Sequence, residues 1–177
     1  MFVTATCYKA AIATIEKCAS QSIHNAVAPM KGAQILSNKE ALQFDTRVMF
    51  VRHPIERLVS CYSHLSWLTY NDYHYDEIIP LGVLTGKGDI EEYRRFVDYI
   101  MDNADPHWTP QYDLMLYNHS FVPNKVHKFE DINAFWGFYA SGMIPHINAW
   151  TARECSPYRL DELLFKYTKD LELWNNA

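Results

Sequence analysis

Two short segments of the sequence contain the residue types that bind phosphate-like anions. In the first segment, Lys17 precedes small and polar residues, which are Cys18, Ala19, Ser20, Gln21 and Ser22. An ammonium group, hydroxyl donors and the free N–H groups at a helix start together suit a phosphate or sulfate group. The segment lacks the GxxxxGK[ST] pattern of a Walker A loop. An ordinary turn between a strand and a helix fits the same residues equally well.

The second segment carries two arginines and a serine. Arg52 follows an apolar run, and Arg57 and Ser60 come three residues apart, so these two can share one face of a helix. Two guanidinium groups can hold a phosphate dianion through paired hydrogen bonds. A solvated helix face, on which Glu56 pairs with one of the arginines, is an equally good interpretation.

Each segment comes directly after a predicted strand. Residues 10–17 (AAIATIEK) and 47–51 (RVMFV) are apolar runs of strand length. In α/β folds, ligands bind beyond the carboxyl ends of the strands. Lys17 and Arg52 stand at these two ends, so we expect both to lie at one edge of the sheet.

The rest of the chain alternates helical and strand patterns. Further short strands are predicted at 34–36 and 125–129, and residues 69–89 are expected to form an irregular excursion that could act as a lid. Helices are predicted at 23–30, 38–44, 55–65, 90–103, 131–141 and 156–174. This alternation predicts one domain over residues 1–177, of the α/β class, with a mostly parallel central sheet flanked by helices.

Composition limits the function. The net charge of −5 argues against a nucleic-acid-binding protein. No run reaches the ~20 apolar residues of a membrane span, and the first 15 residues lack the basic start of a signal peptide. The four cysteines are far apart, so we expect free thiols and a cytoplasmic protein. No Cys and His spacing predicts a metal site.

Several segments resemble one enzyme family. Residues 50–62 (FVRHPIERLVSCY) closely resemble the 3′-phosphate-binding motif of sulfotransferases that use 3′-phosphoadenosine-5′-phosphosulfate (PAPS), in particular the carbohydrate sulfotransferases. Residues 17–23 (KCASQSI) resemble the 5′-phosphosulfate loop of that family. Later matches, in order, are 107–111 (HWTPQ), 128–131 (KFED), 146–148 (HIN) and 167–174 (YTKDLELW). The chain therefore looks like a short member of this family.

The resemblance implies a P-loop-like, three-layer α/β fold and a role for each matched residue. Arg52 and Ser60 would hold the 3′-phosphate of the donor. The 5′-phosphosulfate would be held by Lys17, Cys18, Ala19, Ser20, Gln21 and Ser22. Two positions depart from the family pattern. Glu16 stands where proline is usual, and Gln21 where threonine is usual, so one hydroxyl donor is replaced by an amide.

The implied reaction transfers the sulfuryl group of PAPS to a hydroxyl acceptor, for which a carbohydrate is the expected class, and it needs no metal ion. Lys17 would stabilise charge on the leaving phosphate during in-line attack. A general base would take the acceptor's proton. The candidates for this base are His107 and Glu40, followed by His24, and a structural role is the alternative for each.

Acceptor recognition is expected from the aromatic stretch at residues 67–75, whose rings could stack on sugars. The candidates are Trp67, Tyr70, Tyr73 and Tyr75, with Trp108 and Gln111 as further contacts. Two other functions fit the sequence. One is a small-molecule kinase with a divergent phosphate loop, and the other is a catalytically silent nucleotide-binding or interaction protein that keeps the fold.

Overall fold

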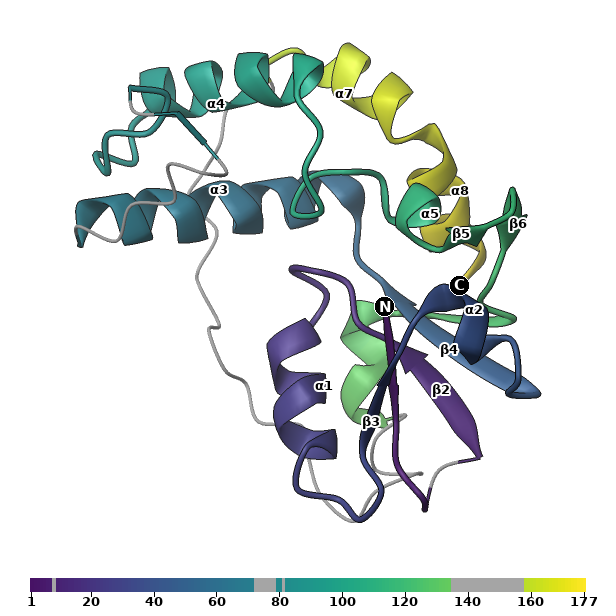
Figure 1. Ribbon diagram of the computed structural model, residues 1–177. Helices are drawn as coiled ribbons and strands as arrows, with labels where there is room; N and C mark the ends of the chain where they lie inside the picture. The colour runs from purple at the N-terminus through teal and green to yellow at the C-terminus, as the bar shows by residue number, and fades with distance from the viewer. Residues whose placement is uncertain (8, 72–78, 81, 135–157) are drawn as a thin grey trace.

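Five strands of the described chain form one central sheet, as Figure 1 shows. The structure is a computed structural model and describes residues 1–7, 9–71, 79–80, 82–134 and 158–177. The strands are β1 (Phe2–Thr4), β2 (Ala10–Ala13), β3 (Gln34–Leu36), β4 (Thr46–Val51) and β7 (Lys125–Lys128). They lie in the order β3-β1-β2-β4-β7. The predicted α/β fold with a mostly parallel sheet is confirmed.

The three strands that carry the site are parallel. β4 pairs with β2 on one side and with β7 on the other, so their carboxyl ends lie at the same edge of the sheet. β1 runs antiparallel to both of its neighbours, β2 and β3. The sequence did not predict β1, because three residues are too few to show an alternating pattern and only pairing with β2 and β3 defines them.

Helices pack on both faces of the sheet. They are α1 (Ser20–Val27), α2 (Asn38–Ala41), α3 (Pro54–Tyr70), α4 (Ile90–Asp102), α5 (Gln111–Leu114), α7 (Leu160–Lys166) and α8 (Thr168–Asn176). A 3-10 turn, η1 (Phe129–Asp131), follows β7, and a small hairpin consists of β5 (Leu116–Tyr117) and β6 (Ser120–Phe121). Of the described helices, none combines the length and the apolar character that crossing a membrane requires.

Alternating side chains of β4 build the two interfaces between sheet and helices. Phe50 belongs to a buried cluster with Ile23 of α1, whereas Met49 and Val51 belong to a cluster that reaches Leu173 of α8. Successive side chains of a strand point to opposite faces, so a continuously apolar strand needs cover on both. A further cluster joins α3, α4 and α7 beside the sheet (Figure 1).

Three predicted elements differ from the observed ones. The strand predicted at 10–17 ends at Ala13, and α1 begins at Ser20 rather than at residue 23. The reason is the turn between them, where Lys17 has a positive φ of 66° that no strand can contain. The predicted tail helix is divided into α7 and α8 at Tyr167, which is buried and donates from its hydroxyl to the Trp108 carbonyl.

The segment predicted to be irregular begins later than expected, because α3 continues to Tyr70. The described part of this segment packs against α3 and α4. Gly86 packs so closely on Tyr70 that a Cβ atom there would lie 2.6 Å from the Tyr70 backbone, and Glu92 accepts from the backbone N–H groups of Thr85 and Lys87. Of the helix predicted at 131–141, residues 135–141 lie outside the described residues.

A buried network joins the last helix to the end of β4. The Gln111 side chain accepts from the Arg52 N–H at 3.0 Å and donates to the Arg52 carbonyl at 2.9 Å. Asp170 of α8 accepts from the backbone N–H groups of Gln111 and Tyr112 at 2.7 and 2.8 Å. Gln111 and Asp170 are fully buried, so the hydrogen bond between them is shielded from water.

This network predicts a large and local stability effect. Asp170→Ala leaves two buried N–H groups without an acceptor and should lower the free energy of unfolding by about 3 kcal/mol. Urea denaturation measures the change. Glu172→Ala, at an exposed position of the same helix, is the control and should shift stability by less than ~0.5 kcal/mol. Equal effects of the two variants would contradict the prediction.

Candidate active site

The turn after β2 has a strained backbone that opens toward the start of α1. Lys17 and Ala19 both adopt positive φ values, 66° and 60°. Such conformations are costly for residues other than glycine and tend to occur at functional sites. Ala19 is the N-cap of α1 and provides no side-chain cap, so the first N–H groups of the helix lack the usual internal acceptor. This is the local geometry that anion-binding helix starts use.

The side chains of this turn are divided between the site and the core. Ser20 and Ser22 are buried at the helix start, and the Ser20 hydroxyl donates to the Glu16 carboxylate at 3.1 Å. Gln21 is exposed and donates to Asn25 one turn along α1. Cys18 is buried and its thiol donates to the Gln111 side chain. Burial raises the pKa of the Cys18 thiol to about 11, so it stays protonated at neutral pH.

Arg52 brings the second predicted segment against the first. Its guanidinium group donates to the Lys17 carbonyl at 3.4 Å and lies 5.2 Å from the ring centre of Phe129, at the end of β7. Its buried Nε atom has no hydrogen-bond partner among the described residues, and the nearest carboxylate oxygen, on Glu56, is 3.8 Å away. Ser60 follows in the second turn of α3, where it is half-buried.

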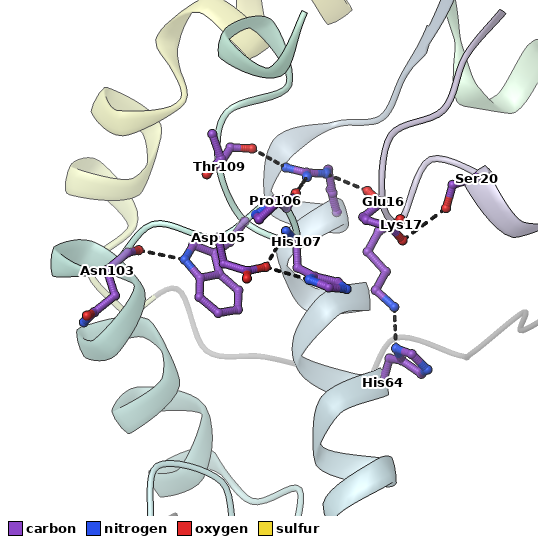
Figure 2. Close-up of polar contacts among 11 residues, drawn as sticks. Glu16, Lys17, Ser20, His64, Asn103, Asp105, Pro106, His107 and Thr109 are labelled. Carbon is purple, nitrogen blue, oxygen red and sulfur yellow. Dashed lines mark hydrogen bonds and ion pairs between the residues drawn. The ribbon is translucent and has the colours of Figure 1, made fainter. Parts of the chain in front are cut away.

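Arg57 has a structural role instead of pointing to an anion. It is 2% exposed, and the dashed lines in Figure 2 that reach Glu16, Pro106 and Thr109 are its hydrogen bonds to their carbonyl oxygens, at 2.8–2.9 Å. Each of the three guanidinium nitrogens therefore donates to a backbone carbonyl. The prediction that Arg57 shares an anion-binding face with Ser60 is wrong, because the Arg57 side chain is buried and each of its nitrogens bonds to the backbone.

Lys17 contacts a histidine that sequence reasoning passed over. Its ammonium group lies against Nδ1 of His64, one turn beyond Ser60 on α3 (Figure 2). Burial lowers the pKa of Lys17. Burial, together with the positive charge of Lys17, lowers the pKa of His64 to about 4, so this ring is neutral at physiological pH and accepts a hydrogen bond.

His107 is oriented by a carboxylate. Its Nδ1 atom lies 2.6 Å from Oδ1 of Asp105, and the same oxygen accepts from the His107 backbone N–H at 2.9 Å. Because Nδ1 faces Asp105, Nε2 is the ring nitrogen that is left for a substrate. Figure 2 shows the His107 ring between Asp105 and the Lys17 side chain, and His107 is near enough to His64 to help lower the pKa of that ring.

The other two candidate bases lie in ordinary helical positions. The carboxylate of Glu40 accepts from the backbone N–H and the hydroxyl of Ser37, at 2.8 and 2.7 Å, which closes a capping box at the start of α2. Its pKa is lowered by these hydrogen bonds. His24 lies within α1 and is half-buried. The Glu40 carboxylate is therefore engaged by Ser37, and His24 has no orienting partner among the described contacts.

Two of the predicted acceptor contacts are corrected by burial. Trp108 is 1% exposed and Gln111 is fully buried, so neither side chain can contact an acceptor. Trp67 and Tyr70 of α3, by contrast, are exposed. Tyr73 and Tyr75 lie outside the described residues.

Comparison with known proteins gives a family match over most of the chain. The model of the sulfotransferase family matches residues 1–139, which is well over half of the chain. The chain belongs to the sulfotransferase family. No curated protein and no solved structure matches it. The matched range includes both predicted anion-binding segments, His64, and the Asp105 and His107 pair, whereas Asp170 of the buried network lies beyond it.

His64 and Asp105 were not among the site residues predicted from the sequence. The signal for His64 was its position four residues after Ser60, which places both on one face of α3. The signal for Asp105 was a carboxylate two residues before His107, a spacing at which a loop can bring the two side chains together. Neither spacing is specific by itself, because only the packing of α3 against the 105–109 loop gives it meaning.

The role of Arg57 can be tested by a substitution that keeps its charge. Arg57→Lys retains a positive charge but not a planar group with three donor directions, so it should lower the free energy of unfolding by about 2–4 kcal/mol. Chemical denaturation measures this effect. Arg94→Lys, on the exposed side of α4, should change stability by less than ~0.5 kcal/mol. A stable Arg57→Lys protein would show that the three carbonyl contacts contribute little.

Proposed function

We propose that this member of the sulfotransferase family transfers the sulfuryl group of PAPS to a hydroxyl group of an acceptor, with a carbohydrate as the acceptor class. The observation that carries the proposal is the meeting of the two predicted segments. The Arg52 guanidinium group bonds to the Lys17 backbone, beside a helix start that lacks a side-chain cap. A donor with an anionic group at each end fits two anion-binding elements that lie side by side.

The buried Nε of Arg52 supports this donor assignment. A buried donor without an acceptor is costly, and a phosphate oxygen would satisfy it. Arg52 and Ser60 would hold the 3′-phosphate. The N–H groups at the start of α1, with Lys17 and the hydroxyls of Ser20 and Ser22, would hold the 5′-phosphosulfate. Cys18, Ala19 and Gln21 would contribute mainly through their backbone, since the Cys18 thiol is buried and the Gln21 side chain is exposed.

PAPS supplies an activated sulfur atom, and the residues of this chain supply charge and proton transfer. The acceptor oxygen forms a bond to sulfur while the bond from sulfur to the phosphate oxygen breaks, and negative charge develops on that departing oxygen. Lys17 would stabilise this charge, because an ammonium group in a half-buried site interacts more strongly than one in water.

His107 is the base that we assign. Its Nε2 would take the proton of the acceptor hydroxyl, and Asp105, which holds Nδ1, would stabilise the imidazolium that forms. Glu40 has a capping role that accounts for its carboxylate, and His24 has no orienting partner among the described contacts. These observations favour His107 over both.

Trp67 and Tyr70 are the acceptor contacts that we assign. Both are exposed on α3, beyond the turn that carries His64, at 40% and 73% of their full surface. Flat aromatic faces pack well against the apolar faces of sugar rings, and the indole N–H and the phenol hydroxyl of these side chains can add hydrogen bonds. This placement extends the site from Ser60 through His64 to the aromatic residues along one helix.

A catalytically silent nucleotide-binding protein is the second candidate, and one contact favours it. The Ser20 hydroxyl already donates to the Glu16 carboxylate, so PAPS would have to displace this carboxylate before it could bind the hydroxyl. A carboxylate beside the phosphosulfate loop also repels an anionic donor. The two candidates differ in transfer and not in binding, so separate assays of binding and of turnover distinguish them.

Donor binding is tested with adenosine-3′,5′-bisphosphate. At a concentration about 100 times its dissociation constant, this ligand should raise the melting temperature by about 5–10 °C. Arg52→Ala should abolish the shift, because it removes the 3′-phosphate contact, whereas Arg94→Ala on α4 should retain it. Thermal unfolding measures both. An intact protein whose melting temperature does not change at saturating ligand would refute the donor assignment.

The base is tested by transfer of label from ³⁵S-PAPS to a panel of carbohydrate and other hydroxyl acceptors. His107→Ala should lower kcat by about 10²–10⁴-fold, and Asp105→Asn should cause a smaller loss, while both variants still bind the bisphosphate. His119→Asn, at an exposed turn, should leave kcat unchanged. Binding of the bisphosphate without any transfer by the intact protein would favour the silent alternative.

A further inference from the structure

The contact between Lys17 and His64 joins two elements that are far apart in the sequence. Lys17 lies in the strained turn after β2, and His64 lies in the third turn of α3. The sulfotransferase motifs in this chain include Lys17 and Ser60 but not His64. Figure 2 shows the Lys17 side chain extending along α3 to reach this ring. A side chain of four rotatable bonds loses considerable entropy when it is held in this way, so the contact needs a compensating gain.

The surroundings of Lys17 explain that gain. Burial disfavours the charge on its ammonium group. The groups close enough to act on it electrostatically are Glu16, Cys61, Arg57 and Arg52. The two arginines also oppose the charge, and burial raises the pKa of the Cys61 thiol to about 12, which leaves it neutral. Glu16 is the carboxylate of this set and already accepts from Ser20. A neutral hydrogen-bond acceptor beside the ammonium group would therefore stabilise its charged form.

His64 meets this need over the whole physiological pH range. Lys17 and His107 are the groups that act on its charge, and both oppose protonation, as burial does. With its pKa near 4, the ring remains neutral and its Nδ1 lone pair remains available to Lys17. The remaining ring proton is then on Nε2. A histidine in this state is an acceptor for the lysine and is not itself a strong base.

The position of His64 also fixes where the ammonium group lies. Ser60, His64 and Trp67 are spaced four and three residues apart, so they share one face of α3. The contact holds the Lys17 ammonium group at the middle of this face. On this face, Ser60, which is proposed for the 3′-phosphate of the donor, and Trp67, which is proposed for the acceptor, lie on either side of His64.

We propose that His64 is a positioning residue that keeps Lys17 charged and aims its ammonium group at the reacting sulfuryl group. The catalytic part of this proposal rests on the proposed function, in which Lys17 stabilises the leaving group. The contact between Lys17 and His64 can be tested without a donor. Loss of the Nδ1 acceptor would leave the ammonium group half-buried beside two arginines. Lys17 would then lose its proton at a lower pH, and charge stabilisation of the leaving group would be lost with it.

The experiment compares His64→Leu with His64→Asn. Leucine removes the acceptor, whereas the amide oxygen of asparagine can occupy the position of Nδ1. His64→Gln is a further variant that is polar but carries its amide one bond farther out, and His119→Asn is the control for loss of an exposed histidine. The first measurement, made without donor, is the pH dependence of Lys17 acetylation by acetic anhydride, followed by mass spectrometry of the folded protein.

In His64→Leu the midpoint of Lys17 acetylation should fall by about one pH unit, which corresponds to the loss of one hydrogen bond to a charged group. The midpoint should remain near that of the parent protein in His64→Asn and His119→Asn, and it should be intermediate in His64→Gln. A midpoint that is unchanged in His64→Leu would overturn the proposal.

The second measurement is the pH profile of ³⁵S transfer. The ammonium form of Lys17 is the active one, so activity is lost as pH rises through the pKa of Lys17. The alkaline limb of kcat should therefore move to lower pH in His64→Leu and return in His64→Asn. If the parent protein transfers no label but the acetylation midpoint still shifts, the proposed function fails and the charge-holding role of His64 stands. If it transfers label and neither profile moves, His64 has no such role.

Discussion

The arrangement of the site depends on one buried guanidinium group. Arg57 donates to the carbonyl oxygens of Glu16, Pro106 and Thr109, and so it fastens the turn after β2 to the loop that precedes α5. Lys17 follows the first of these contacts and His107 lies between the other two. A neutral side chain could not satisfy three carbonyl groups from two loops, and a lysine lacks the planar geometry. Arg57 therefore fixes the Lys17 charge and the proposed base, His107, relative to each other, although Arg57 need not contact either substrate.

A second network fixes Arg52. Gln111 holds both backbone polar groups of Arg52 and also accepts from the Cys18 thiol, while Asp170 of α8 holds Gln111. The carboxyl ends of β2 and β4 are thus held together by a loop and a helix that come much later in the chain. Burial disfavours the charge on Asp170, and the N–H groups of Gln111 and Tyr112 oppose that effect. Such a network is stable only when every member has its partner.

Local patterns predicted those parts of the fold that are governed by short-range forces. The continuous apolar run of β4, Pro54 at the start of α3 and the periodicity of α4 were all recognisable, because each reflects burial or a backbone preference within one element. β1 and the break at Tyr167 were not recognisable. The first exists through pairing with β2 and β3, and the second through the burial of Tyr167 against Trp108. Both depend on contacts between residues distant in sequence.

For the site, the sequence by itself determined the residue types that can bind anions, their position after two parallel strands, and a family motif that includes Arg52 and Ser60. Residue chemistry alone could not separate the roles of Arg52 and Arg57, because two arginines five residues apart look alike until their surroundings are known, and only the family resemblance named Arg52. Tertiary structure decided that Arg57 is enclosed by carbonyl groups and that Arg52 retains an unpaired buried donor. It also brought His64 to Lys17, because the path of α3 past the turn after β2 is set by packing between elements and not by any local pattern.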